Sequence, residues 1–129
     1  MHRDVKPGNL LVEEGPGAPV ARLGDFGLAR GEEGGLTRSG FPAGTLEYMA
    51  PEQLAGTGPA DFRADVYALG ATLYAVLAGK PPFEDLARAA ARSDPTSLLR
   101  GILSQDPPPL GAAAPPELAL VAARAMEKE

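Results

Sequence analysis

The sequence contains no cysteine, no tryptophan and a single histidine. Without cysteine, the chain can form neither a disulfide nor a zinc site built on thiolates. One histidine leaves no histidine cluster for a metal ion either. These absences exclude disulfide-stabilised proteins and metal centres of the cysteine or histidine type.

Aromatic residues, excess positive charge and long apolar runs are also scarce. Aromatic residues make up 5% of the chain, so a core has to rely on leucine, valine and alanine. The formal net charge of −5 argues against a nucleic-acid-binding protein, which would need a basic face. No apolar run approaches the roughly 18 to 20 residues of a membrane span, and no signal peptide is visible. We expect at most one domain, cytoplasmic, with no nucleic-acid partner and no membrane segment in this piece.

Residues 2–9 read H-R-D-V-K-P-G-N and combine three groups suited to phosphoryl transfer. That reaction needs in-line positioning and neutralisation of charge more than covalent chemistry. Asp4 offers a carboxylate to the attacking hydroxyl, Lys6 an ammonium to the phosphate, and Asn9 an amide oxygen of the kind that Mg²⁺ accepts. An Arg-Asp pair alone is usually a solvated ion pair, so the segment gains its meaning from the motifs that follow.

Further motifs follow in order along the chain. Short strands at 10–12 and 20–23, joined by a turn at 15–17, predict a hairpin. This hairpin would bring Asp25, the first residue of a D-F-G triplet, back beside Asn9, where both could share a bound Mg²⁺. The later motifs are G-T at 44–45, Y-M-A-P-E at 48–52, D-V-Y-A-L-G at 65–70 and G-K-P-P-F at 79–83.

Apolar periodicity predicts helices in the second half of the chain. The strongest is at 63–78, where apolar residues cover most of the circumference, so the helix should be buried, and Gly79 is a natural stop. Shorter helices are expected at 86–92 and 97–104. Pro116 and Glu117 open a last helix that should run to about residue 128.

Taken together, these motifs resemble those of the eukaryotic-type (Hanks-type) bacterial serine/threonine protein kinases. The resemblance covers essentially the whole chain but only the C-terminal lobe of a kinase. It implies an α+β fold, mostly α-helical, with a short β-hairpin near the N-terminus and the N-terminal lobe absent. The implied domain is a partial kinase domain over 1–129, with a catalytic loop at 2–9, an activation segment at 25–52 that begins with the D-F-G triplet 25–27, and a central helix at about 63–78.

The resemblance also implies roles for individual residues. Asp4 would be the catalytic base, Lys6 would contact the γ-phosphate of ATP, and Asn9 and Asp25 would hold Mg²⁺. A lysine two residues after the base is the serine/threonine arrangement, as distinct from the tyrosine one. The implied ligands are therefore ATP, Mg²⁺ and a protein substrate with a serine or threonine hydroxyl.

Other positions have supporting roles in that family, and each also has a simpler explanation. Asp65 would bind the backbone of the catalytic loop, although a carboxylate in a first helical turn is also favoured by the helix dipole. Glu52 would lack its usual arginine partner, which leaves its charge poorly compensated if it is buried. The remaining positions of this kind are His2 and Phe26, which pack in the family, Gly27 of the D-F-G triplet, and Thr45, which would bond near the base and the lysine.

The segment after the D-F-G triplet contains two candidate phosphorylation sites. Thr37 and Ser39 follow a polar, glycine-rich stretch at 31–35. A phosphate on either hydroxyl could pair with Arg3 and order the segment. The alternative is that both are ordinary hydroxyls in a solvated loop.

Residues 1–129 contain no G-x-G-x-x-G phosphate loop and no V-A-I-K strand lysine. Two functions remain open. The first is a serine/threonine kinase, a signalling enzyme of which this piece alone would be inactive because the partner N-terminal lobe is missing. The second is a non-catalytic binding module or a truncated relic of a kinase lobe, since a lone lobe would expose the apolar surface that faces the missing one.

Overall fold

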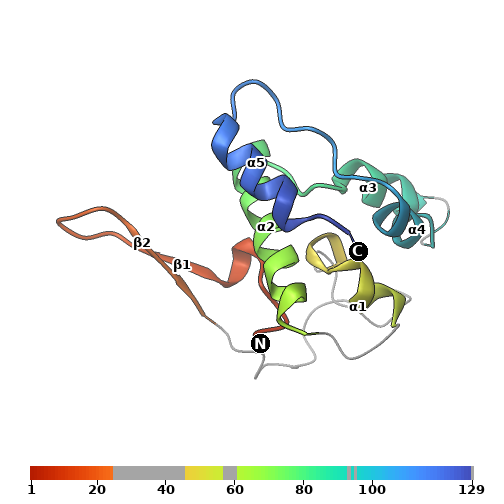
Figure 1. The fold of residues 1–129 in the computed structure, drawn as a ribbon, viewed down its shortest axis with the longest axis horizontal. Helices are drawn as coiled ribbons and strands as arrows, with labels where there is room; N and C mark the ends of the chain where they lie inside the picture. Colours follow the sequence, from red (N-terminus) through yellow and green to blue (C-terminus); the bar gives the residue numbers. More distant parts are fainter. Residues whose placement is uncertain (25–45, 57–60, 93, 95, 129) are drawn as a thin grey trace.

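A computed structural model describes residues 1–24, 46–56, 61–92, 94 and 96–128. The described part is mostly helical and includes one small sheet (Figure 1). This matches the expected α+β class. In chain order the elements are η1 (Pro7–Asn9), β1 (Leu10–Glu13), β2 (Val20–Leu23), η2 (Leu46–Tyr48), α1 (Pro51–Ala55), α2 (Phe62–Ala78), α3 (Glu84–Arg92), α4 (Thr96–Ser104) and α5 (Pro116–Ala125).

The two strands form an antiparallel hairpin that projects away from the helices (Figure 1). Leu10 pairs with Leu23, and Glu13 pairs with Val20 at the far end. Because most of the hairpin extends into solvent, the side chains of Leu11 and other apolar residues on it are exposed. The base of the hairpin, where Leu10 follows η1, is therefore the part that can take part in a site.

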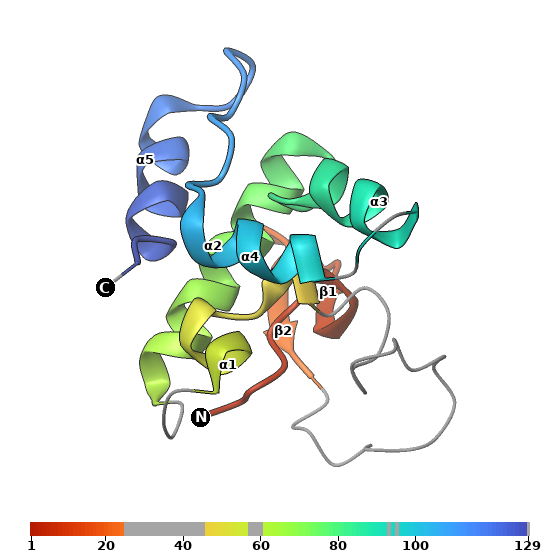
Figure 2. The same ribbon diagram turned by 90° about the vertical axis from the view of Figure 1, so that its right-hand side faces the viewer.

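Helix α2 is the central element. The side chain of Asp61 accepts a hydrogen bond from the backbone N–H of Arg63 at 2.8 Å, which caps the first turn. The helix ends at Gly79, whose φ of 72° is a left-handed conformation that glycine adopts without steric cost. Helices α1, α3 and α4 lie on one side of α2, and α5 packs along another (Figures 1 and 2).

The core lies between α2 and the later helices. Ile102 of α4 and Met126 after α5 are almost fully buried. They meet Phe83 and the inner face of α2, which contributes Tyr67 and Tyr74. Since alanine fills much of the remaining space, the composition prediction of a core poor in aromatic residues agrees with the packing.

One expectation about α2 is confirmed on one face of the helix only. Apolar residues cover most of its circumference, which predicted that the helix is buried, and the side that faces the core is buried. In the structure Val66, Leu69 and Val76 are exposed, because no described helix covers the side of α2 that faces away from the core. Periodicity predicts that a face is apolar, but it does not show whether another element covers it.

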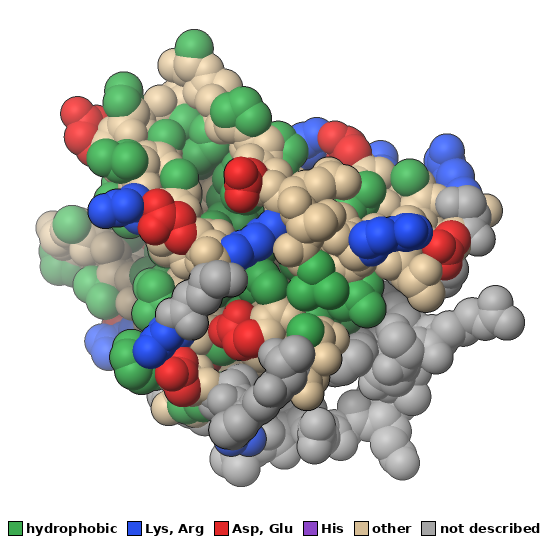
Figure 3. Space-filling view, turned by 45° about the vertical axis from the view of Figure 1, so that its right-hand side comes forward, with side chains coloured by type: hydrophobic (Ala, Val, Ile, Leu, Met, Phe, Trp, Pro, Cys, Tyr) green, Lys and Arg blue, Asp and Glu red, His purple; other side chains and the backbone are tan. Residues whose placement is uncertain are grey.

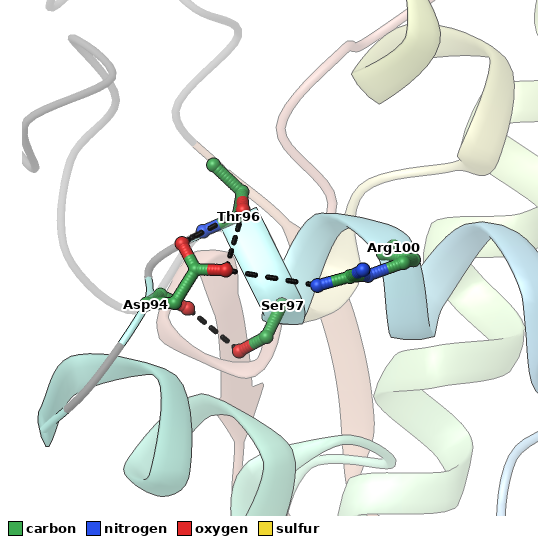
Figure 4. Close-up of polar contacts among 4 residues, drawn as sticks. All are labelled: Asp94, Thr96, Ser97 and Arg100. Carbon is green, nitrogen blue, oxygen red and sulfur yellow. Dashed lines mark hydrogen bonds and ion pairs between the residues drawn. The ribbon is translucent and has the colours of Figure 1, made fainter.

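Helix α4 begins at a network of side chains around Asp94 (Figure 4). The Asp94 carboxylate accepts hydrogen bonds from the backbone N–H of Thr96 at 3.0 Å and from its hydroxyl at 2.7 Å. The Ser97 hydroxyl donates to the Asp94 carbonyl oxygen, and Arg100 lies 3.6 Å from the carboxylate. These hydrogen bonds, first of all those from Thr96, hold the pKa of Asp94 below its usual range.

No helix among the described residues is long and apolar enough to cross a membrane.

Candidate active site

Three of the predicted functional residues meet at η1. Pro7 starts this short turn, and the backbone N–H of Asn9 closes it by donating to the Lys6 carbonyl oxygen at 3.0 Å. The turn directs the Asn9 side chain inward, where it is buried. Its amide nitrogen donates to the backbone carbonyl oxygen of Asp4 at 2.6 Å and to the Asp4 carboxylate at 2.9 Å.

The Asp4 carboxylate also forms an ion pair with Lys6, whose Nζ lies 3.0 Å from Oδ2. The two side chains are 25% and 34% exposed for Lys6 and Asp4 respectively, so water and a ligand can still reach them. The structure therefore places a carboxylate, an ammonium and an amide together on the same short loop. Because the Asn9 nitrogen faces Asp4, its amide oxygen is left to accept a cation.

Asp65 attaches this loop to α2. Its carboxylate accepts a hydrogen bond from the backbone N–H of His2 at 2.7 Å and from that of Arg3 at 2.8 Å. Arg3 has a φ of 70°, an uncommon conformation for a residue with a side chain. The contact that the family resemblance implies for Asp65 is thus present. The dipole of the first turn of α2 favours the same carboxylate, so the two explanations are compatible.

The base of the hairpin closes the other side of the loop. The backbone N–H of Gly24 donates to the Asn9 carbonyl oxygen at 2.8 Å, and Nε2 of His2 donates to the Gly24 carbonyl oxygen at 3.0 Å. The return of the chain to Asn9 is as the sequence predicted, up to Gly24. Sequence reasoning missed Gly24 itself, because a residue that contributes only its backbone leaves no side-chain signal.

Several predicted residues lie outside the part that the structure describes. Asp25, the second expected Mg²⁺ ligand, is one of them. The others are Phe26, Gly27, Thr37, Ser39 and Thr45.

The described residues offer few ligands for a metal ion. Among residues 1–24, 46–56, 61–92, 94 and 96–128, no group of three or more histidine, cysteine or acidic side chains could hold one. Of the two residues that the resemblance assigns to Mg²⁺, Asn9 is described, and its amide oxygen suits this hard, oxygen-preferring ion. The described part of the chain therefore contains one of the two expected Mg²⁺ ligands.

Glu52 is not buried. It lies in the first turn of α1, is exposed to solvent, and begins a helix whose N-terminal dipole favours a negative charge. The concern about an uncompensated buried charge therefore does not apply to this residue.

A cleft of about 740 Å³ lies apart from this loop, between α1, the start of α2 and the end of α5. Glu52, Tyr67 and Lys128 are among its lining residues, whereas Asp4, Lys6 and Asn9 are not. On the molecular face drawn in Figure 3, acidic and basic side chains are interspersed with apolar ones. This cleft and the candidate chemistry are thus in different places, and the hydrogen-bonded loop is the better candidate for the active site.

Comparison with known proteins identifies the family of the chain. The family model described as "Protein kinase domain" matches residues 1–112. The chain is 42% identical over 115 residues to the serine/threonine-protein kinase PknF of Mycobacterium tuberculosis, covering 86% of this chain and 22% of that protein. It is 43% identical over 112 residues to the serine/threonine-protein kinase Pkn1 of Myxococcus xanthus, covering 84% and 15%.

A shorter match has higher identity. The DNA damage-responsive serine/threonine-protein kinase RqkA of Deinococcus radiodurans is 53% identical over 85 residues, which is 64% of this chain and 12% of that protein. The chain thus spans about a fifth or less of the length of these curated relatives. Since the domain model covers most of the sequence and includes the Asp4 loop, the chain belongs to the protein kinase domain family.

Proposed function

We propose that residues 1–129 supply the catalytic-loop part of a serine/threonine protein kinase, which transfers the γ-phosphate of ATP to a protein hydroxyl. The observation that carries this proposal is the Asp4 carboxylate, which is held by Asn9 and Lys6 on a loop attached to α2 by Asp65. Kinase relatives at 42% and 43% identity over most of the chain support the same reaction class.

In this proposal each side chain has one task. Asp4 orients the substrate hydroxyl and accepts its proton, because a carboxylate is the acceptor within reach on this loop. Lys6 places positive charge beside the transferred phosphoryl group. Asn9 fixes the orientation of Asp4 through its amide nitrogen and offers its oxygen to Mg²⁺, with Asp25 as the second proposed ligand. When bound, Mg²⁺ would neutralise charge on the phosphate oxygens of ATP.

The choice of serine and threonine over tyrosine hydroxyls rests on Lys6. It lies two residues after Asp4 and contacts the same carboxylate at 3.0 Å. This spacing is the one that the resemblance assigns to serine/threonine kinases, and the relatives at 42% and 43% identity are named as such.

The 129-residue chain alone should show no measurable phosphate transfer, because its sequence has no glycine-rich phosphate loop and no strand lysine, and this reaction depends on positioning and electrostatics. This expectation is tested by incubating the purified chain with Mg²⁺-ATP, radiolabelled on the γ-phosphate, and a generic protein substrate, and by measuring the label transferred to the substrate. Transfer that Asp4→Asn abolishes would contradict it.

The roles of the residues can be tested in a chimera. The matching segment of the kinase domain of the Mycobacterium tuberculosis relative is replaced by residues 1–112 of this chain. We expect the chimera to phosphorylate protein serine or threonine, and Asp4→Asn to lower kcat by roughly 10²- to 10⁴-fold. Asp61→Asn is the matched control, because asparagine also caps a helix and Asp61 lies outside the loop. A folded chimera with no activity would sink the proposal.

A second candidate is a non-catalytic module that binds through its apolar surface. The specific observation is that Leu11, Val12 and Val20 are exposed on the hairpin. Asp4→Asn separates the two candidates in a chimera or a longer protein, because it removes phosphate transfer in the first and leaves binding unchanged in the second.

A further inference from the structure

The chain contains three lysines, and two of them form an ion pair with a neighbouring carboxylate. Nζ of Lys6 lies 3.0 Å from the carboxylate of Asp4, and Nζ of Lys80 lies 2.8 Å from that of Asp85. The hydrogen bond to Asp85 raises the pKa of Lys80. A carboxylate at this distance stabilises the ammonium form, which has no lone pair and cannot act as a nucleophile.

The third lysine, Lys128, has a different environment. It follows α5, is partly buried, and lines the cleft between α1, the start of α2 and the end of α5. Its Nζ donates a hydrogen bond to the carbonyl oxygen of Gln105 and lies 5.8 Å from the centre of the Phe83 ring. The part of the chain that the structure describes holds no acidic side chain in an ion pair with Lys128.

This environment favours the neutral amine of Lys128. Burial lowers its pKa, and the charge of Asp106 opposes this shift only in part. A neutral amine can donate one N–H to Gln105 and still keep its lone pair available. The cleft beside it, about 740 Å³ in volume and lined in part by Val66 and Leu103, has room for a small molecule. A lysine that is desolvated beside apolar side chains is the type that reacts as a nucleophile.

We propose that Lys128 is an acylation site of this protein, with a small acyl phosphate such as acetyl phosphate as the donor. The Nζ lone pair attacks the acyl carbon, so that a C–N bond forms, the C–O bond to phosphate breaks and inorganic phosphate leaves. The nitrogen releases one proton to water. The product is a neutral amide, which loses the cation–π contact with Phe83 and therefore holds the end of α5 less tightly against Gln105.

Competition among the three lysines tests the site. The 129-residue chain is incubated with acetyl phosphate at about pH 8, and mass spectrometry measures acetylation at each lysine. We expect the initial rate at Lys128 to exceed that at Lys80 by roughly threefold or more. In urea this preference should disappear, because it comes from the fold. Equal rates at the two lysines in the folded chain overturn the proposal, and so does a preference that persists in urea.

A matched variant tests the cause of the preference. Asp85→Asn removes the ion pair of Lys80, so the rate at Lys80 should rise toward the rate at Lys128, which should stay as in wild type. Far-UV circular dichroism checks that the variant is folded. An unchanged rate at Lys80 would contradict the proposal, because the ion pair would then not be what protects the amine.

The structural consequence is tested with two substitutions of Lys128. Lys128→Gln copies the neutral amide of the product, whereas Lys128→Arg keeps a positive charge. Hydrogen exchange of the segment 101–114 should be about twofold or more faster in Lys128→Gln than in wild type, and close to wild type in Lys128→Arg. Equal exchange in the two variants would contradict the loosened contact between α5 and Gln105.

Discussion

Asp65 is the residue through which the candidate active site depends on the helical core. One carboxylate accepts the backbone N–H groups of both His2 and Arg3, and Arg3 adopts a φ of 70°. A side chain in that region costs conformational energy, which has to be offset by contacts that exist only in the folded state. The position of Asp4, one residue further on, follows from this arrangement.

We expect Asp65→Ala to lower the free energy of unfolding by about 1 to 3 kcal/mol, because two backbone donors lose a charged acceptor and Arg3 keeps its unfavourable conformation. Asp65→Asn keeps one acceptor oxygen and should have a smaller effect. Urea titration measures both. Arg3→Gly should recover part of the loss in the Asp65→Ala background, because glycine adopts this φ freely. Equal stability of Asp65→Ala and wild type would contradict this account.

The sequence predicted which side chains meet at this loop, but it did not predict the backbone groups that hold the loop in place. Asp4, Lys6 and Asn9 could be grouped from the sequence because they lie within six residues of one another and their chemistry is in their side chains. Gly24 could not be found in this way, because it contributes a carbonyl oxygen and an N–H that every residue has.

At the scale of the elements, the sequence predicted the bounds of α2 almost completely, but it did not predict which face of the helix is covered. The expected helix at 63–78 is found at 62–78, since the Asp61 cap begins it one residue earlier. The last helix was expected to reach about residue 128 but ends at 125, where Met126 leaves the helical conformation. Helix α1 was not predicted, because five residues are too few to show a period. Which face of α2 is covered depends on distant elements, so local periodicity could not show it.

The packing of α5 on α2 predicts that substitution of Gly70 destabilises the protein. A methyl group on Gly70 would lie 2.6 Å from Cβ of Ala125 and 3.2 Å from the Ala122 carbonyl oxygen. Neither atom can move without moving α5, so Gly70→Ala should lower the free energy of unfolding by about 1 to 3 kcal/mol, although alanine favours helix. Gly8→Ala, which meets nothing within 4 Å, is the control for thermal denaturation. A higher midpoint for Gly70→Ala would mean that the two helices are less closely packed.

The hydrogen bonds at the start of α4 predict how the stability of the protein changes at low pH. The pKa of Asp94 is lowered, first by the hydrogen bonds from Thr96, so the folded state holds its proton less tightly than the unfolded state. Asp94 therefore contributes stability above its ordinary pKa, and this contribution is lost as the pH falls through the lowered value. Asp94→Asn keeps the cap and has no charge to titrate, so its loss of stability in acid should be shallower than that of wild type. Parallel acid titrations that follow the same curve for both chains would contradict this.

At the scale of the whole molecule, the core includes tyrosines whose hydroxyl groups are poorly solvated. Burial raises the pKa of Tyr67 well above its ordinary value of 10.0, and the charge of Glu52 raises it further. Burial is also the first cause of the raised pKa of Tyr48 and of Tyr74. The folded protein thus keeps these three groups protonated in a range where the unfolded chain ionises.

Stability should therefore be lost in alkali, with Tyr67 as the main cause among the three. A raised pKa means that its contribution is complete below pH 10 and falls as the pH rises above that value. The buried Tyr67 hydroxyl has no hydrogen-bond partner among the described residues, so Tyr67→Phe should change the free energy of unfolding at pH 7 by less than about 1 kcal/mol. The variant should lose stability less steeply than wild type between about pH 10 and 12, as measured by urea titration at each pH, with Tyr48→Phe as the comparison for a less buried tyrosine. If Tyr67→Phe and wild type decline in parallel, ionisation of Tyr67 is not what limits the fold in alkali.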